Sequence, residues 1–134
     1  MTLFEIVALY VALHLIVASF LVYRVGQIRL KEKVSLGDGG NAQLNARIRA
    51  HGNYIENTPL ALIGLVALAM LSAPALLLHL FGMAFLIGRL VHAHGMAQDG
   101  ANGRGRGIGA ILTLLTYVGT ALSLLYFIFT SDYI

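Results

Sequence analysis

Long apolar runs dominate the chain and alternate with polar stretches. Each run approaches the roughly 20 residues that an α-helix needs to cross a hydrocarbon core about 30 Å thick. We therefore predict an all-α, integral membrane four-helix bundle that forms a single domain over residues 1–134. The predicted spans are Leu3–Tyr23, Asn53–Leu71, Ala75–His92 and Ile108–Phe129.

The connections between these spans are of two kinds. A very short turn near Ser72–Pro74 joins the second and third spans, and its proline suits the first turn of a following helix. The connections at about residues 24–52 and 93–107 are long, polar and rich in glycine, which is typical of loops. Residues 41–52 are expected to continue the second helix, although their apolar positions do not follow a clean 3.6-residue period.

Composition supports membrane insertion. Hydrophobic residues make up 58% of the chain and charged residues 11%, against about 25% charged in a soluble domain, and the mean hydropathy is +0.80. The N-terminus lacks the positive segment of a cleaved signal, so the first apolar run is expected to remain as a helix. The chain has no cysteine, so any thiol chemistry requires a thiol supplied by a ligand.

The placement of the basic residues is more informative than the net charge of +3. All of them lie in the two long connections or at adjacent helix ends, so the positive-inside rule places both polar loops in the cytoplasm and both termini outside. Because these charges flank membrane spans, we expect no nucleic-acid partner. They are Arg24, Arg29, Lys31, Lys33, Arg47, Arg49, Arg89, Arg104 and Arg106.

A polar group lies at the start of the second span. Arg49, Asn53 and Glu56 are spaced i, i+4 and i+7 and therefore share one helix face. Ionisable groups at the mouth of a membrane span are costly, so they indicate a binding site, here for a small zwitterion. Pro59 removes one helical hydrogen bond. It is either a packing kink or a bend that aims Asn53 and Glu56 at a neighbouring helix.

Two further arginines have two interpretations each. Arg89, which shares a face with His92, either extends to the lipid headgroups or pairs with Glu56. Arg106 either anchors the bundle by the positive-inside rule or holds an anion. The free N–H groups and the dipole at the start of the fourth helix favour the anion.

The remaining polar residues of the spans receive structural interpretations. His14 and His79 are expected to form hydrogen bonds between helices, and Tyr117 is expected to pack against its neighbours. No metal site is expected, because His92 and His94 diverge on a helix and no carboxylate motif accompanies them.

The segment from Arg49 to Pro59 reads Arg-x-His-x-Asn-x-x-Glu-x-x-Pro. Together with the four spans and the basic first connection, this segment resembles the MAPEG family, the membrane-associated proteins of eicosanoid and glutathione metabolism. The compact size is similar to that of bacterial members. Further segments resemble the ends of the family's first and third helices and the start of its fourth: Gly26–Arg29, Gly88–His92 and Arg104-x-Arg106.

The resemblance implies a homotrimer in a bacterial inner membrane, in contact with membrane lipids. Glutathione would be the co-substrate, bound between neighbouring subunits on the cytoplasmic side. Its thiolate, stabilised by Arg106 and Arg29 as catalytic residues, would attack a lipophilic small molecule or lipid hydroperoxide. Glu56 would take the amino group of glutathione. The binding residues implied are Arg49, Asn53, Glu56, Arg89, His92, Gln27 and His51.

Two departures from the family pattern leave catalysis less well supported than binding. A tyrosine beyond the third-helix arginine is absent, with His94 or Met96 in that region, and Gly52 replaces an arginine of some relatives. One alternative is therefore a non-catalytic lipid- or ligand-binding protein of the same fold. Another is a small transporter, although Glu5 and Glu56 lie near span ends rather than at the midplane where transport sites lie.

Overall fold

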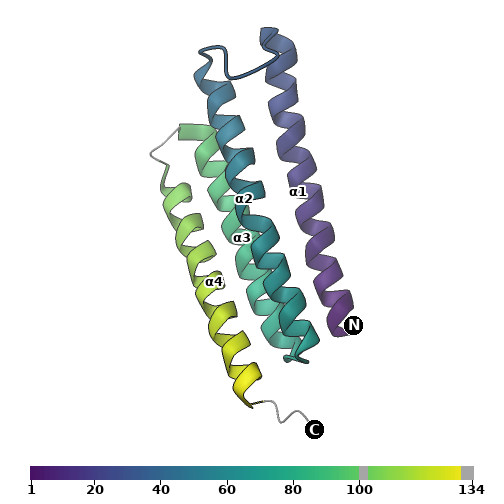
Figure 1. Ribbon diagram of the computed structural model, residues 1–134. Helices are drawn as coiled ribbons and strands as arrows, with labels where there is room; N and C mark the ends of the chain where they lie inside the picture. The colour runs from purple at the N-terminus through teal and green to yellow at the C-terminus, as the bar shows by residue number, and fades with distance from the viewer. Residues whose placement is uncertain (100–102, 131–134) are drawn as a thin grey trace.

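The computed structural model describes residues 1–99 and 103–130, which form four α-helices (Figure 1). The prediction of an all-α four-helix bundle is confirmed. The helices run alternately up and down. Each contains one predicted span, except that the last residue of the second span, Leu71, is the C-cap of its helix. They are α1 (Leu3–Glu32), α2 (Ala42–Met70), α3 (Ala75–Asp99) and α4 (Arg104–Thr130).

All four helices extend beyond the predicted spans at one end of the bundle, where α1 and α3 finish and α2 and α4 begin. The expectation that residues 41–52 continue the second helix is confirmed, because Asn41 caps α2 by accepting a hydrogen bond from the backbone N–H of Leu44 at 2.9 Å. Lysine and arginine gather here, so we call this the basic end; the N-terminus lies at the opposite, far end.

The helices differ in their hydropathy. Within the described residues, three are long and apolar enough to cross a membrane: Leu3–Glu32, Ala75–Met96 and Arg104–Thr130. Helix α2 does not meet this measure, because Asn53, Glu56 and Asn57 interrupt its apolar sequence. It lies beside α1, α3 and α4 through the same thickness of the bundle, so its polar residues can face other helices rather than lipid.

Helices α2 and α3 are central, and α1 and α4 lie on opposite sides of them. At the far end, Ile6 and Tyr10 of α1 pack into a buried apolar cluster with Leu68 and Leu78. The Tyr10 hydroxyl lies 3.1 Å from His79 Nδ1, and His14 Nδ1 lies 2.6 Å from the Tyr54 hydroxyl. The expectation that both histidines form interhelical hydrogen bonds is therefore confirmed.

Glycines bring α3 and α4 together near the basic end. A methyl group added at Gly109 would lie 2.5 Å from the carbonyl oxygen of Gly88 and from Cβ of His92. Such distances exclude any side chain without movement of a helix. This close approach sets the first turns of α4 against the third helix at His92.

Candidate functional site

A cavity of about 470 Å³ opens at the basic end between α2 and α4, with α3 behind it. It brings together four of the predicted binding residues and one predicted catalytic residue: Arg49, Asn53, Glu56 and His92, with Arg106. We call it the basic cleft. Its full lining is Ile48, Arg49, Gly52, Asn53, Glu56, His92, Met96, Arg106 and Ala110.

The helical register explains this arrangement. Arg49, Asn53 and Glu56 follow one face of α2, as predicted from their spacing, and that face borders the cleft. Arg49 and Glu56 are exposed, whereas Asn53 is half-buried and His92 is buried. The cleft therefore has charged groups of both signs at its rim and neutral polar groups at its floor.

Arg106 lies in the first turn of α4, where its backbone N–H donates to the carbonyl oxygen of Gly103 at 3.0 Å. The helix begins earlier than the predicted span, at Arg104. The side chain of Arg106 is exposed and lines the cleft. Arg104, two residues earlier, is also exposed but does not line the cleft.

Arg89 is almost completely buried, with 1% of its surface exposed. Its Nη2 donates to Asn53 Oδ1 at 2.6 Å and its Nη1 to Thr113 Oγ1 at 3.3 Å. Its guanidinium lies over the Tyr54 ring, 5.8 Å from the ring centre.

Both interpretations of Arg89 from the sequence are therefore wrong. The side chain does not extend to the surface, and within the described residues it forms no ion pair with Glu56. The reason is the rotation of α2 about its axis. Asn53 faces α3 and meets the guanidinium, whereas Glu56 is turned toward solvent at the rim of the basic cleft.

Arg89 also lines a second, smaller cavity of about 220 Å³, which we call the inner cavity. It shares Asn53, His92 and Ala110 with the basic cleft, so the two are contiguous. Its remaining lining residues are Asn57, Arg89, Thr113, Leu114 and Tyr117. Two buried nitrogen atoms on its lining residues, Arg89 Nε and His92 Nδ1, have no hydrogen-bond partner in the described structure.

The sequence analysis missed Asn57, Thr113 and Tyr117. Tyr117 was expected only to pack, but its hydroxyl donates to the backbone carbonyl oxygen of Asn57 at 2.7 Å. A signal for this face exists in the sequence. Thr113, Thr116 and Thr120 are spaced i, i+3 and i+7 in an otherwise apolar helix, and all three are buried.

Farther from the basic end, an apolar trough of about 350 Å³ continues between α2 and α4. Tyr117 lines both this trough and the inner cavity. The other residues that line the trough are small or aliphatic apart from Thr120: Leu60, Ala61, Ile63, Gly64, Ala67, Thr120, Ala121 and Leu124.

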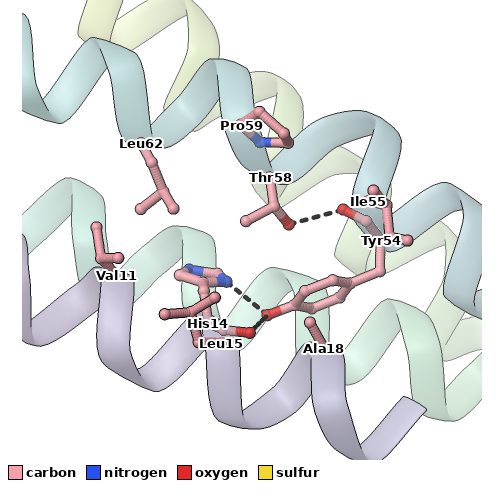
Figure 2. Close-up of a pocket in the computed structure, with 9 residues that line it drawn as sticks. All are labelled: Val11, His14, Leu15, Ala18, Tyr54, Ile55, Thr58, Pro59 and Leu62. Atoms are coloured by element: carbon pink, nitrogen blue, oxygen red, sulfur yellow. Dashed lines mark hydrogen bonds between the residues drawn. The ribbon is translucent and has the colours of Figure 1, made fainter. Parts of the chain in front are cut away.

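A further cavity, of about 300 Å³, lies between α1 and α2 (Figure 2). Pro59 and Leu62 of α2 face Val11 and His14 of α1 across it. The Tyr54 hydroxyl contacts His14 here, and the Thr58 hydroxyl donates to the Tyr54 carbonyl oxygen at 2.7 Å. We call this cavity the α1–α2 pocket; none of the predicted site residues lines it.

Three predicted residues line neither the basic cleft nor the inner cavity of their own chain. Arg29 Nη1 donates to the carbonyl oxygens of Val34 and Ser35 at 3.4 and 3.3 Å, and Gln27 Nε2 donates to the Tyr23 hydroxyl at 2.9 Å. Both belong to α1, on the opposite side of the bundle from α4. His51 is half-buried on α2 and lines none of the cavities above.

Comparison with known proteins identifies the family. The model of the MAPEG family matches residues 7–126, which include every residue that lines the basic cleft. The chain belongs to the MAPEG family. With three helices long and apolar enough to cross a membrane, this member is an integral membrane protein.

Two relatives are similar over part of this MAPEG protein. The inner membrane protein YecN of Escherichia coli K12 is 34% identical over 88 residues, which make up 66% of this chain and 67% of YecN. YecN of Escherichia coli O6:H1 matches with the same identity and coverage. The name of these relatives gives their location and no activity.

Proposed function

We propose that this MAPEG protein is a glutathione-dependent transferase or peroxidase of the inner membrane and that glutathione binds in the basic cleft. The observation that carries the proposal is the set of charges at the rim of this cleft. Glutathione has two carboxylates, one ammonium group and one thiol. The cleft offers Arg49 and Arg106 to anions and Glu56 to a cation. Its volume of about 470 Å³ lies within the range of small-molecule sites.

The geometry suggests a role for each group. Glu56 accepts hydrogen bonds from the ammonium group. Arg49, which lies on the same face of α2, holds a carboxylate. Arg106 and the first-turn N–H groups of α4 attract the thiolate. A free thiol has a pKa of about 8.5, and cations of this kind lower it toward neutrality.

The thiolate then acts as a nucleophile. In a transferase it forms a C–S bond with an electrophilic carbon, which expels a leaving group or takes up a proton at the neighbouring carbon. In a peroxidase it attacks the terminal oxygen of a hydroperoxide, and the O–O bond breaks to give an alcohol and glutathione sulfenic acid. A second glutathione converts the sulfenic acid to the disulfide and releases water.

A homotrimer would complete this site. Arg29 and Gln27 do not reach the basic cleft of their own chain, so a role in ligand binding requires a cleft of a neighbouring subunit. Helix α4 packs mainly on α3, which leaves much of its apolar surface free for such a contact. The positive-inside rule places the basic end in the cytoplasm, where glutathione is made.

Isothermal titration of the detergent-solubilised protein with glutathione tests the proposal. We expect saturable binding that Glu56→Gln weakens by about tenfold, equivalent to roughly 1.4 kcal/mol. Arg104→Ala is a matched control for Arg106→Ala, because both arginines are exposed in the same turn and only Arg106 lines the cleft. No binding at millimolar glutathione, or equal effects of the two arginine variants, would contradict the proposal.

The apolar trough favours a second candidate function, the binding of a lipid without catalysis. Assays of glutathione conjugation to a generic electrophile and of hydroperoxide reduction separate the two. Conjugation or reduction above the rate in protein-free detergent supports the enzyme. Lipid binding in the absence of both reactions supports the non-catalytic protein.

A further inference from the structure

A second group of basic side chains lies at the basic end, on the α1 side of α2. Arg47 Nη1 of α2 donates to the carbonyl oxygen of Arg24 in α1 at 2.9 Å. His51 follows Arg47 by four residues and therefore shares its face of α2. That face continues to Tyr54, which contacts His14 of α1. Arg24, Arg47 and His51 therefore gather where α1 and α2 meet, and we call them the basic seam.

The basic seam has nitrogen atoms and charges without partners. Nε of Arg47 and Nε2 of His51 are buried and have no hydrogen-bond partner in the described structure. The guanidinium of Arg24 lies over the Phe20 ring, 5.7 Å from its centre, and neither arginine forms an ion pair within the described residues. Desolvation and the nearby charge of Arg24 lower the pKa of the Arg47 guanidinium. Two neighbouring cations without a counter-charge favour the binding of an anion.

The basic seam lies at the boundary of the membrane. Arg24 directly follows the first predicted span, and His51 is two residues before the second. Basic pockets between membrane helices on the cytoplasmic side bind anionic lipid head groups at this depth. Guanidinium groups also suit phosphate, because it accepts two parallel hydrogen bonds from one arginine. The depth of the seam therefore favours a lipid phosphate over a soluble anion.

The α1–α2 pocket continues from the basic seam toward the middle of the bundle (Figure 2). Ala18, the residue of α1 that lines the pocket nearest the seam, precedes Arg24 by six residues, or about 9 Å of helix. A glycerol backbone and the first carbons of an acyl chain can cover that distance. Leu15 and Ile55 line the pocket and are exposed, so the pocket opens to the surface of the bundle. The seam and the pocket are therefore in line for the head group and one chain of a phospholipid.

We propose that the basic seam binds the phosphate of an anionic phospholipid, with one acyl chain in the α1–α2 pocket. Arg24 and Arg47 hold the phosphate oxygens, and His51 donates a further hydrogen bond. The lipid supplies the missing counter-charge and fixes α1 against α2 at the membrane boundary. Neither the seam nor the pocket shares a residue with the basic cleft, so this site does not depend on the proposed function.

Native mass spectrometry of the protein in neutral detergent tests the proposal, because it counts the lipid molecules bound. We expect phosphatidylglycerol to bind roughly tenfold more tightly than phosphatidylcholine with the same chains. Inorganic phosphate at millimolar concentration should not displace it. Equal affinities for the two lipids would overturn the anionic head group, and displacement by inorganic phosphate would overturn the lipid as the source of the phosphate.

Arg24→Gln removes one charge of the seam and keeps the hydrogen bond from Arg47, because the acceptor is the backbone of Arg24. We expect phosphatidylglycerol to bind about fivefold more weakly. Lys31→Gln is a matched control, since Lys31 is exposed on the same helix. It lies about 10 Å farther along α1, beyond the screening length of about 8 Å at physiological salt. Glutathione affinity, measured by calorimetry, should be the same in both variants. Equal phosphatidylglycerol affinities in the two variants would contradict the assignment even if the protein binds glutathione.

A pair of substitutions on α1 locates the chain. Ala18 lines the α1–α2 pocket, whereas Ala12 is exposed and lines none of the cavities described above. We expect Ala18→Leu to weaken phosphatidylglycerol binding severalfold and Ala12→Leu to leave it unchanged. Thermal unfolding without added lipid checks that both variants are folded. Equal lipid affinities in these two folded variants would overturn the placement of the acyl chain.

Discussion

Helix α2 separates two regions that bury polar groups in different ways. On its α1 side, His14, Tyr54 and Thr58 form hydrogen bonds with one another or with the backbone, and the groups involved are neutral side chains and a carbonyl (Figure 2). On its α4 side, Arg89 is buried with only neutral partners. His14 Nε2 also lacks a partner, but one imidazole nitrogen costs less than an uncompensated guanidinium. The two sides of α2 therefore differ in buried charge and not in the presence of buried polar groups.

The largest expected effect is that of Arg89→Met, which removes the charge and keeps much of the side-chain volume. We expect glutathione-dependent activity to fall at least 100-fold, because the guanidinium holds Asn53 at the floor of the basic cleft. The substitution takes one hydrogen bond each from Asn53 and Thr113 but leaves no opposite charge buried, so the thermal midpoint should change little. Activity assays and thermal unfolding in detergent measure both. A lower midpoint together with retained activity would make Arg89 a structural residue.

Tyr54→Phe should lower the stability of the protein and leave glutathione binding almost unchanged, the opposite of the pattern expected for Arg89→Met. It leaves Nδ1 of His14, now bonded at 2.6 Å, without its partner in a buried position. We expect a loss of about 1–3 kcal/mol of stability with glutathione affinity almost unchanged. Phe85→Leu, next to the same histidine but without a hydrogen bond, is a control for packing alone. A loss of glutathione binding in Tyr54→Phe would mean that the two sides of α2 are coupled.

Tyr117→Phe should have the smallest effect. The hydroxyl donates one hydrogen bond to the Asn57 carbonyl oxygen, and its loss should cost about 0.5–1.5 kcal/mol of stability. Because Tyr117 lines the inner cavity and the trough but not the basic cleft, glutathione affinity should not change. An effect on glutathione affinity as large as that of Glu56→Gln would place glutathione differently from our proposal.

The four helices and the face of α2 that lines the basic cleft could be predicted because they depend on local patterns. Span lengths follow from runs of apolar residues, and the shared face of Arg49, Asn53 and Glu56 follows from 3.6 residues per turn. Both are properties of one segment considered alone.

The partners of Arg89 could not be predicted in this way. Whether Asn53 or Glu56 meets the guanidinium depends on the rotation of α2 against α3, which close packing at many positions determines together. Asn57, Thr113 and Tyr117 were missed because they belong to two helices far apart in the sequence, so no local pattern groups them. They form a polar cavity only when two helices meet. The roles of Arg29 and Gln27 stay predictions, because they concern a second chain.

The state of the thiol of bound glutathione tests the central claim most directly. Ultraviolet difference absorbance at pH 7 reports the thiolate. Our account predicts a thiolate band for the wild-type complex, loss of the band in Arg106→Ala, and a band of full intensity in Arg104→Ala. A complex that holds glutathione as the neutral thiol, or a band that survives Arg106→Ala, would contradict it.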